Sequence, residues 1–215
     1  MLGLLRVKYH QLLMLRDRGY DIKSDPNYNL VTYQFSQLDA AVPYYEELKE
    51  DLRKHFSQEY RHEATGHKCF VQYWAEPGNS VSKSVISDLA EYAYNHKVTK
   101  AILISDKKLS PPANAQLGEL ASLLTHFLES ALTYNPLGAA IVPTHRLLSE
   151  REAAQIFDGS TITKGNLPLI HTTDPPIKWL DGQPGQVVEI KRRVFGVQST
   201  MCPDTLVYRI VVKGK

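Results

Sequence analysis

The fold of the first part of this chain is decided by the stretch Lys100-Ala101-Ile102-Leu103-Ile104-Ser105. The stretch is short and apolar in its centre, as expected for a buried strand. A second run of strand-forming residues precedes it at Lys68–Ala75, and Pro77-Gly78 ends that run. A helix through about Tyr94 is expected between the two strands, because three serines ahead of it are candidate N-caps.

The alternation continues after the central strand. Ser110-Pro111-Pro112 predicts a helix start, because Ser caps helices and Pro suits the first helical position. The apolar stripe of this helix is expected to run from Ala113 to Ala131, and residues 138–142 are expected to form another strand. Strands that alternate with helices indicate crossover units on a largely parallel sheet. The first part of the chain is therefore predicted to be an α/β domain.

Helices are expected before this sheet. Leucines crowd the first eighteen residues, and Gly19 stands where a helix would end. A second helix is expected with Pro43 near its first turn. Its apolar positions recur at helical spacing: Tyr44, Leu48, Leu52 and Phe56.

The last third of the chain has a different pattern, typical of a small α+β domain. Ile141–His145 is expected to open a short helix, and Ser149 with Glu152 forms a capping box for a helix that ends near Phe157-Asp158-Gly159. Strands are predicted at 187–190 and 206–212. We place the domain boundary between residues 142 and 143, which gives domains 1–142 and 143–215.

Composition narrows the possible functions. The 215 residues are enough for two modest cores, and 43% apolar with 22% charged residues is ordinary for a globular protein. A net charge of +2 gives no global nucleic-acid signal. Cys69 and Cys202 lie far apart, which favours a reducing compartment. The chain is expected to be soluble and intracellular, since it has no signal segment and no run near the ~20 apolar residues of a membrane span.

Enzyme motifs are mostly missing. The sequence contains no phosphate-binding loop, no dinucleotide-binding glycine motif and no serine-nucleophile elbow. His62 and His67 are five residues apart, whereas the zinc-protease motif needs histidines four apart on one helix face, and Cys69 adds only a third ligand. We therefore predict no catalytic residue, no metal, no cofactor and no small-molecule substrate.

One short segment keeps a nuclease alternative open. Asp106 lies two residues before Lys108 at the end of an apolar strand, which is half of the signature of a Mg²⁺-dependent nuclease. The other half, an acidic residue on a neighbouring strand, has no candidate in Lys68–Ala75. A charged turn after a strand is the alternative interpretation.

Two basic clusters are candidate contacts for phosphates. Lys100, Lys107 and Lys108 flank the turn Leu109-Ser110-Pro111-Pro112, where a helix N-terminus beside lysines would attract anions through backbone N–H groups and the helix dipole. Such a contact reads no base sequence. The second cluster, Lys191-Arg192-Arg193, is interpreted as a solvated face.

A series of short patterns in the last third resembles a known family. The patterns are Val142-Pro143 with His145, Leu167-Pro168, Asp174-Pro175, Gly185-Gln186-Val187-Val188 and Tyr208-Arg209. Their order and spacing resemble the shared fifth subunit of eukaryotic nuclear RNA polymerases and the short archaeal relative of that subunit. In the first part, Arg16–Tyr20, Glu76-Pro77 and Leu109–Ala113 match the family in order.

The resemblance implies a non-catalytic, architectural subunit of a multisubunit DNA-directed RNA polymerase. The C-terminal domain would dock on the largest subunit, beside other polymerase subunits. The N-terminal domain would form part of the lower jaw near downstream duplex DNA, with a fold similar to restriction-type nucleases but without their catalytic residues. Subunit-binding positions would be Pro143, His145, Leu167, Pro168, Asp174, Pro175, Gly185 and Arg209, and DNA-proximal positions would be Lys107, Lys108, Ser110, Pro111 and Pro112.

Two departures from the family pattern affect the expected source of the chain. Arg193–Pro203 is longer than the usual turn, and Asp174–Leu180 looks more like copies carried by large DNA viruses. A viral copy implies the virion and the host cytoplasm, and a cellular copy implies the nucleus. A free-standing DNA- or protein-binding adaptor is the remaining alternative to a polymerase subunit.

Overall fold

The structure, a computed structural model, describes residues 1–33, 35–47, 52–74, 80–158, 163–192 and 205–214. The chain divides into two compact units, Met1–Tyr134 and Asn135–Lys215. The domain boundary that the sequence places after residue 142 stays a prediction. Pro77-Gly78, Gly159, Cys202 and the departed segment 193–203 lie outside the described residues.

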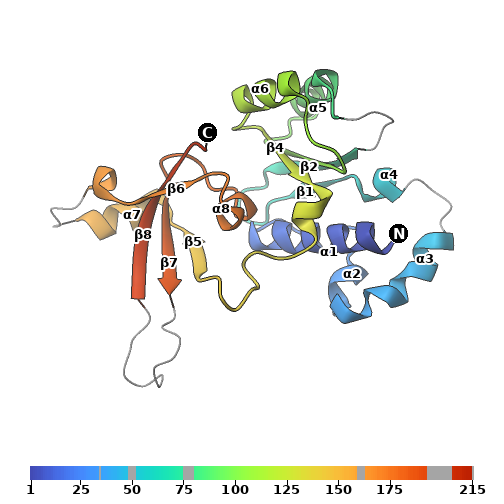
Figure 1. Cartoon of the computed structure of the whole chain (residues 1–215), viewed down its shortest axis with the longest axis horizontal. Helices are drawn as coiled ribbons and strands as arrows, with labels where there is room; N and C mark the ends of the chain where they lie inside the picture. The colour runs from blue at the N-terminus through green and yellow to red at the C-terminus, as the bar shows by residue number, and fades with distance from the viewer. Residues whose placement is uncertain (34, 48–51, 75–79, 159–162, 193–204, 215) are drawn as a thin grey trace. The chain divides into compact units, whose positions relative to one another are not determined.

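Unit 1 is built on a four-stranded sheet (Figure 1). Its strands are β1 (Gln58–Arg61), β2 (Lys68–Trp74), β3 (Lys100–Ser105) and β4 (Leu124–Leu128), in the order β1-β2-β3-β4. Strands β2, β3 and β4 run parallel, and only β1 is antiparallel to its neighbour. The predicted strands at 68–75 and 100–105 and the largely parallel sheet are therefore confirmed.

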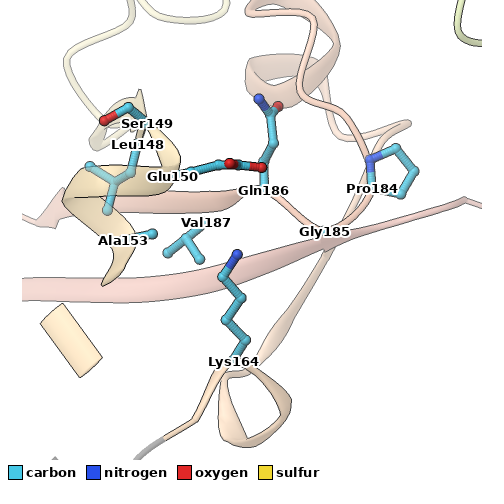
Figure 2. A pocket seen from close by; sticks show the side chains of 9 residues that line it. All are labelled: Leu148, Ser149, Glu150, Ala153, Lys164, Pro184, Gly185, Gln186 and Val187. Carbon is cyan, nitrogen blue, oxygen red and sulfur yellow. The ribbon is translucent and has the colours of Figure 1, made fainter. Parts of the chain in front are cut away.

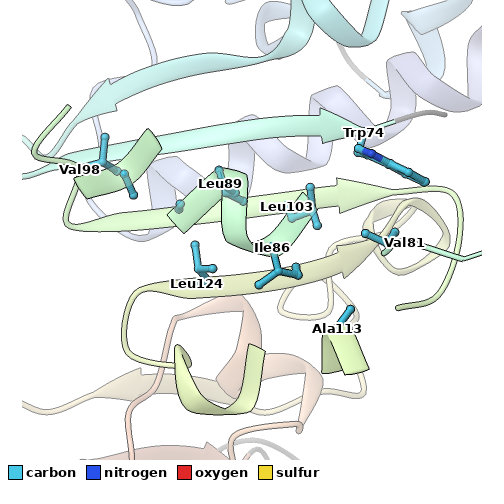
Figure 3. Packing of buried hydrophobic residues seen from close by; sticks show 10 residues of the cluster. Trp74, Val81, Ile86, Leu89, Val98, Leu103, Ala113 and Leu124 are labelled. Carbon is cyan, nitrogen blue, oxygen red and sulfur yellow. The ribbon is translucent and has the colours of Figure 1, made fainter. Parts of the chain in front are cut away.

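Two helices cover one face of this sheet. They are α5 (Lys83–Asn95) and α6 (Pro111–Glu119), as the alternating pattern predicts. Figure 3 shows the buried cluster beneath them, in which Ile86 and Leu89 of α5 lie against Leu103 of β3 and Leu124 of β4. The burial of these apolar side chains, each stabilising by about 1.5–3 kcal/mol, holds the crossover helices on the sheet.

The prediction for residues 113–142 was wrong in two places. The helix ends at Glu119 instead of continuing to Ala131, and the third parallel strand is β4 rather than residues 138–142, which form turns. Leu124 and Phe127 are three residues apart, which suggested a helical stripe. In the sheet they are both buried because they point to opposite faces, each of which is covered.

The opposite face of the sheet is covered by α1 (Leu2–Asp17), which ends before Gly19 as predicted. Gln11 of α1 accepts a hydrogen bond from the Tyr73 hydroxyl of β2 at 3.4 Å. Short helices complete this layer: α2 (Asn29–Thr32), η1 (Phe35–Ala41), α3 (Val42–Glu47), α4 (Leu52–Phe56) and η2 (Glu129–Leu132). The predicted second helix thus appears as α3 and α4. Residues 48–51 between them, which include the predicted apolar position Leu48, lie outside the described residues.

Unit 2 contains a second four-stranded sheet. Its strands are β5 (Thr144–Leu147), β6 (Leu169–His171), β7 (Val187–Arg192) and β8 (Thr205–Val212), in the order β5-β7-β8-β6. The pairs β5–β7 and β7–β8 are antiparallel, and β6 joins β8 in parallel. The predicted strands at 187–190 and 206–212 are confirmed, whereas the expected helix start at 141–145 is wrong because Thr144–Leu147 pairs as an edge strand.

Three helices flank this second sheet: α7 (Glu150–Phe157), η3 (Lys164–Asn166) and α8 (Pro175–Trp179). On the face that we call the α8 face, Val188, Ile190 and Val211 pack against Ile177 of α8. On the α7 face, Val187 packs with Leu148 and Ala153. The mixed α/β content and the two sheets agree with the fold class that the sequence predicts.

Among the described helices, none combines the length and the apolar character that a membrane crossing requires.

Candidate functional site

The predicted DNA-proximal residues lie at the carboxyl end of β3, where parallel α/β sheets usually bind ligands. Asp106 and Lys108 are exposed and Lys107 is partly exposed. The turn is fixed from within, because the buried Ser105 hydroxyl lies 2.7 Å from the Lys107 carbonyl and 2.7 Å from His126 Nε2. A carbonyl can only accept, so the hydroxyl donates to Lys107 and the His126 Nε2–H donates to Ser105.

A second connection fixes the same turn through the residue that precedes α5. The Val81 amide donates to the Lys108 carbonyl at 3.0 Å, and the Ser110 amide donates to the Val81 carbonyl at 2.9 Å. Together with the bonds of Ser105, these bonds hold the backbone of both lysines. Their ammonium groups are therefore carried on a firmly positioned turn.

The N-terminus of α6 does not offer the backbone donors that we expected for a phosphate. Pro111 and Pro112 occupy its first positions and carry no N–H. The Ala113 N–H bonds the Ser110 hydroxyl oxygen at 3.4 Å, and the Asn114 N–H bonds the Ser110 carbonyl at 2.9 Å. Any phosphate contact at this turn therefore depends on the lysine side chains.

The nuclease alternative gains no second ligand from the fold. β2 and β4, the neighbours of β3, contain no acidic residue. Glu129 follows β4, but its carboxylate is paired with Arg53 at 3.0 Å. Within the described part of the chain, no group of three His, Cys, Asp or Glu side chains is placed to hold a metal ion. His62 and His67 belong to a turn in which the His62 N–H bonds the His67 carbonyl at 2.8 Å.

The predicted subunit-binding residues of unit 2 fall into separate groups. Pro143 and His145 lie at the β5 edge, where His145 Nδ1 lies 2.7 Å from the Pro143 carbonyl. Leu167 and Pro168 precede β6 at the opposite edge, and the Ile210 amide donates to the Pro168 carbonyl at 3.0 Å. The sequence patterns therefore do not converge on one edge of the sheet.

Arg209 joins the second group, whereas Gly185 lies beside β8 ahead of β7. The Arg209 guanidinium donates to the Leu169 carbonyl at 2.9 Å, which ties β8 to β6. Gly185 has φ +88°, and its amide donates to the Val211 carbonyl at 2.9 Å. A Cβ at position 185 would meet nothing within 4 Å, so the backbone conformation and not lack of space favours glycine there.

Asp174 and Pro175 stand at the start of α8. Pro175 is the first helical residue and Asp174 the N-cap, but the Asp174 side chain makes no capping hydrogen bond. Its Oδ1 is buried and has no hydrogen-bond partner among the described residues. This carboxylate therefore does not fix the turn through a capping bond. The Asp174 amide bonds the His171 carbonyl at 3.0 Å, and this backbone bond together with Pro175 sets the geometry.

A pocket of about 280 Å³ lies on the α7 face of unit 2 (Figure 2). Its apolar floor consists of Leu148, Ala153 and Val187, all of which are buried. Glu150 and Lys164 project from different sides of its mouth, and Gln186 adds an amide. The remaining lining residues are Ser149, Pro184 and Gly185.

Comparison with known proteins connects this architecture to RNA polymerases. The family profile described as RNA polymerase Rpb5, C-terminal domain, matches residues 134–211. Subunit Rpo5 of the DNA-directed RNA polymerase of Pyrococcus horikoshii is 38% identical over 80 residues, which are 37% of this chain and 92% of the archaeal one. The chain belongs to the Rpb5 family. Its resemblance to the fifth polymerase subunit and to the short archaeal relative is thereby confirmed.

A eukaryotic member of the Rpb5 family matches the chain nearly end to end. It is subunit RPABC1 of the DNA-directed RNA polymerases I, II and III of Caenorhabditis elegans, 24% identical over 212 residues, or 97% of this chain and 95% of that subunit. The corresponding figures for Rpo5 of Thermofilum pendens are 33% identity over 81 residues, 38% of this chain and 95% of the archaeal subunit. The short archaeal chains are thus about the size of unit 2.

Sequence reasoning missed the residues that shape the pocket of this Rpb5-family chain. Glu150 and Lys164 are exposed charges on short helices, where charges are ordinary, and no local pattern sets them apart. Leu169 belongs to no predicted site, yet 57% of it is exposed on an edge strand. An apolar residue that directly follows Leu167-Pro168 was the available signal.

Proposed function

We propose that unit 2 docks on the largest subunit of a multisubunit DNA-directed RNA polymerase and that unit 1 forms part of the lower jaw beside downstream DNA. The observation that carries the first half is the match of residues 134–211 to the Rpb5 C-terminal family profile. Archaeal relatives consist of little more than the 80 or so residues that they share with this chain. A unit of this size is thus a polymerase subunit by itself in those organisms, which supports assembly through unit 2.

The jaw proposal rests on the fold of unit 1. Three parallel strands with helices on both faces and a lysine-bearing turn at the carboxyl end of β3 fit a nuclease-like scaffold, in which the described residues place no paired catalytic carboxylates. Lys107 and Lys108 would contact DNA phosphates, with Ser110, Pro111 and Pro112 shaping the turn beside them. Contacts of this kind position DNA without reading its sequence.

The compartment follows from the source of the chain. A cellular copy would work in the nucleus. A copy from a large DNA virus would be found in the virion and the host cytoplasm, and the departure from the family pattern at Asp174–Leu180 supports this second possibility.

Affinity purification of the tagged full-length chain from its native source tests the proposal. We expect the two large catalytic chains of the polymerase to be recovered with it in near-equal amounts. Recovery of the chain alone, or with partners that are not polymerase subunits, would instead favour the free-standing adaptor.

A further inference from the structure

We propose that the pocket on the α7 face holds one aliphatic side chain of the largest polymerase subunit, flanked by a carboxylate that meets Lys164 and a cationic group that meets Glu150. This inference rests on the proposed docking of unit 2 and names the chemistry of the segment that docks there. The pocket residues are Leu148, Ser149, Glu150, Ala153, Lys164, Pro184, Gly185, Gln186 and Val187.

The floor of the pocket continues into an apolar row across the sheet. Val187 of β7 lies opposite Ile210 of β8, and Ile210 lies opposite Leu169 of β6. Residues directly opposite each other share a face, so all three point to the α7 face. Val187 is 1% exposed, Ile210 is partly buried and Leu169 is 57% exposed. The row therefore leads from the buried floor to an open sheet edge.

The exposure of apolar residues along β8 adds to this row. β8 lies between β7 and, at residues 210–212, β6, and its α7 face carries Leu206, Tyr208, Ile210 and Val212, a pattern typical of a covered face. Yet Leu206 is 50% exposed, and Tyr208 and Ile210 are only partly buried. These three residues alternate along β8 and so share the α7 face with Leu169. The cover that the pattern predicts for this face is incomplete within the described residues.

The charges at the mouth of the pocket indicate which charged groups flank the aliphatic side chain that it holds. Neither the Lys164 ammonium group nor the Glu150 carboxylate makes an ion pair with a described residue, and both are exposed. Gln186 uses its Oε1 to accept from the Gln183 amide at 2.7 Å, while its amide nitrogen has no partner among the described residues. An opposite pair of rim charges and an amide N–H beside Glu150 orient an incoming peptide segment (Figure 2).

The arrangement of the pocket argues for a side chain of a partner protein. The polar groups lie at the rim and the floor is apolar, which is the arrangement of an anchor pocket at a protein interface. The unit that carries it is the part of the chain that matches the Rpb5 profile, so the polymerase itself is the natural source of the occupant.

Site-specific photo-crosslinking identifies the occupant. The cross-linking residue p-benzoylphenylalanine is placed in the full chain at Lys164, at Leu169 and, as a control, at Ala154, which is exposed on α7 beside the buried Ala153. After assembly in the native source and irradiation, we expect cross-links from the first two positions to the largest polymerase subunit, and much less from the control. Cross-links to a second copy of this chain, to a different protein, or to none would overturn the inference.

Substitutions at the rim of the pocket measure how much its charges contribute to docking, without disturbing the core. Lys164→Glu should lower recovery of the largest subunit roughly fivefold at low salt, and the effect should shrink at high salt. Arg151→Glu, which reverses an exposed positive charge on α7 outside the pocket, should leave recovery unchanged. Equal recovery with both variants would count against the pocket.

A pocket-filling variant provides an independent test. Ala153→Leu should occupy the floor and reduce recovery more than tenfold, whereas Ala154→Leu makes the same change on the exposed side of the helix and should not. If Ala153→Leu proves unfolded by circular dichroism, the rim variants decide. Failure of the wild-type chain to recover the largest subunit would refute the proposed function itself. Normal wild-type recovery with insensitive pocket variants would refute only this inference.

Discussion

The ammonium nitrogen of Lys8 lies 2.8 Å from Oδ2 of Asp25, and both side chains are 0% exposed. Lys8 also donates to the Tyr60 hydroxyl at 2.8 Å and to the Phe56 carbonyl at 3.1 Å, so all three of its N–H groups have acceptors. Tyr60 donates a short hydrogen bond to the same Asp25 oxygen. This buried ion pair joins α1 to the chain segment before α2 and to β1.

Removal of one partner of this pair should strongly destabilise the fold. Lys8→Met leaves the Asp25 carboxylate buried without its counter-ion, which should lower the free energy of unfolding by about 3–5 kcal/mol. Adding Asp25→Asn should recover part of that loss, with a coupling of at least about 1 kcal/mol in urea unfolding. The exposed pair Arg16–Asp17, with a 3.0 Å separation, supplies the control, because Asp17→Asn should change stability by less than about 1 kcal/mol. Strict additivity of the two buried substitutions would contradict the pairing.

The same pair should make stability depend on pH in the acid range. Burial alone would raise the pKa of Asp25, but Lys8, Tyr60 and the Asn27 N–H hold it below its ordinary value. Asp25 therefore stabilises the fold above its unfolded pKa, and this stabilisation is lost as pH falls through the lower folded pKa. Burial lowers the pKa of Lys8 to about 8, so its charge persists at neutral pH.

Urea unfolding at several pH values checks this dependence. The difference in unfolding free energy between the wild-type chain and Asp25→Asn should narrow as pH falls below about pH 4. A difference that stays constant down to about pH 2 would show that Asp25 is not the titrating group.

Gly19 is required by both its backbone and its neighbour. Its φ is +83°, and a Cβ there would lie 2.9 Å from His62 Nε2. Gly19→Ala should therefore cost about 1–3 kcal/mol of unfolding free energy. His62→Ala in the same chain should relieve the contact but not the backbone strain. Gly3→Ala, in α1 with nothing within 4 Å of the added Cβ, should be neutral or stabilise by up to about 1 kcal/mol in thermal melts.

Two helix N-caps in unit 2 should respond differently to alanine. The Ser149 hydroxyl accepts from the Glu152 amide at 3.3 Å, while the Glu152 carboxylate accepts from the Ser149 amide at 2.8 Å. Ser149→Ala should cost about 1 kcal/mol. The Asp174 side chain makes no capping bond, so Asp174→Ala should change unfolding free energy by less than about 0.5 kcal/mol. A reduced recovery of the largest subunit by the folded Asp174→Ala chain would mark that buried carboxylate as a docking group, as the family pattern predicts.

Replacing Lys107 and Lys108 together by glutamate should weaken retention of downstream DNA by the assembled polymerase. Because α6 supplies no free backbone donor at this turn, the ammonium groups carry the proposed contact. The loss should be equal across DNA sequences, larger at low salt, and accompanied by a salt slope smaller by about one per phosphate contact. Lys97→Glu, which lies before β3 at the opposite end of the strand, is the control. A defect limited to particular sequences, or no defect at low salt, would rule out this site.

Several elements could be predicted from sequence because their determinants are local. Ser149 and Glu152 are three residues apart and bond each other across a single helical turn, so their pattern defines the start of α7. The apolar run at 100–105 forms β3 because a buried parallel strand requires little beyond continuous hydrophobicity. Family membership could likewise be inferred, since the order and spacing of short patterns can be recognised from the sequence alone.

The candidate sites were only partly predictable, because the order of the strands decides which of the predicted residues lie close together. Leu167 and His145 were both predicted subunit contacts, yet they lie toward opposite edges of a sheet whose order is β5-β7-β8-β6. Leu169, which follows Leu167 by two residues, emerged only when its register with Ile210 and then Val187 was known. The phosphate site at α6 was misjudged for a local reason, since the two prolines that favour the helix start also remove its donors.

By itself, the sequence determined the order of most helices and strands, because periodicity and capping act over a few residues. It also determined the family, because the spaced motifs are visible in the sequence alone. Only the tertiary structure decided that Leu124–Leu128 is a strand, since its two buried residues face different layers. It alone brought Lys8 to Asp25, 17 residues away, and to Tyr60, 52 residues away. Such contacts depend on how separate elements pack in three dimensions. The free energy that stabilises them is gained only when the whole core packs together.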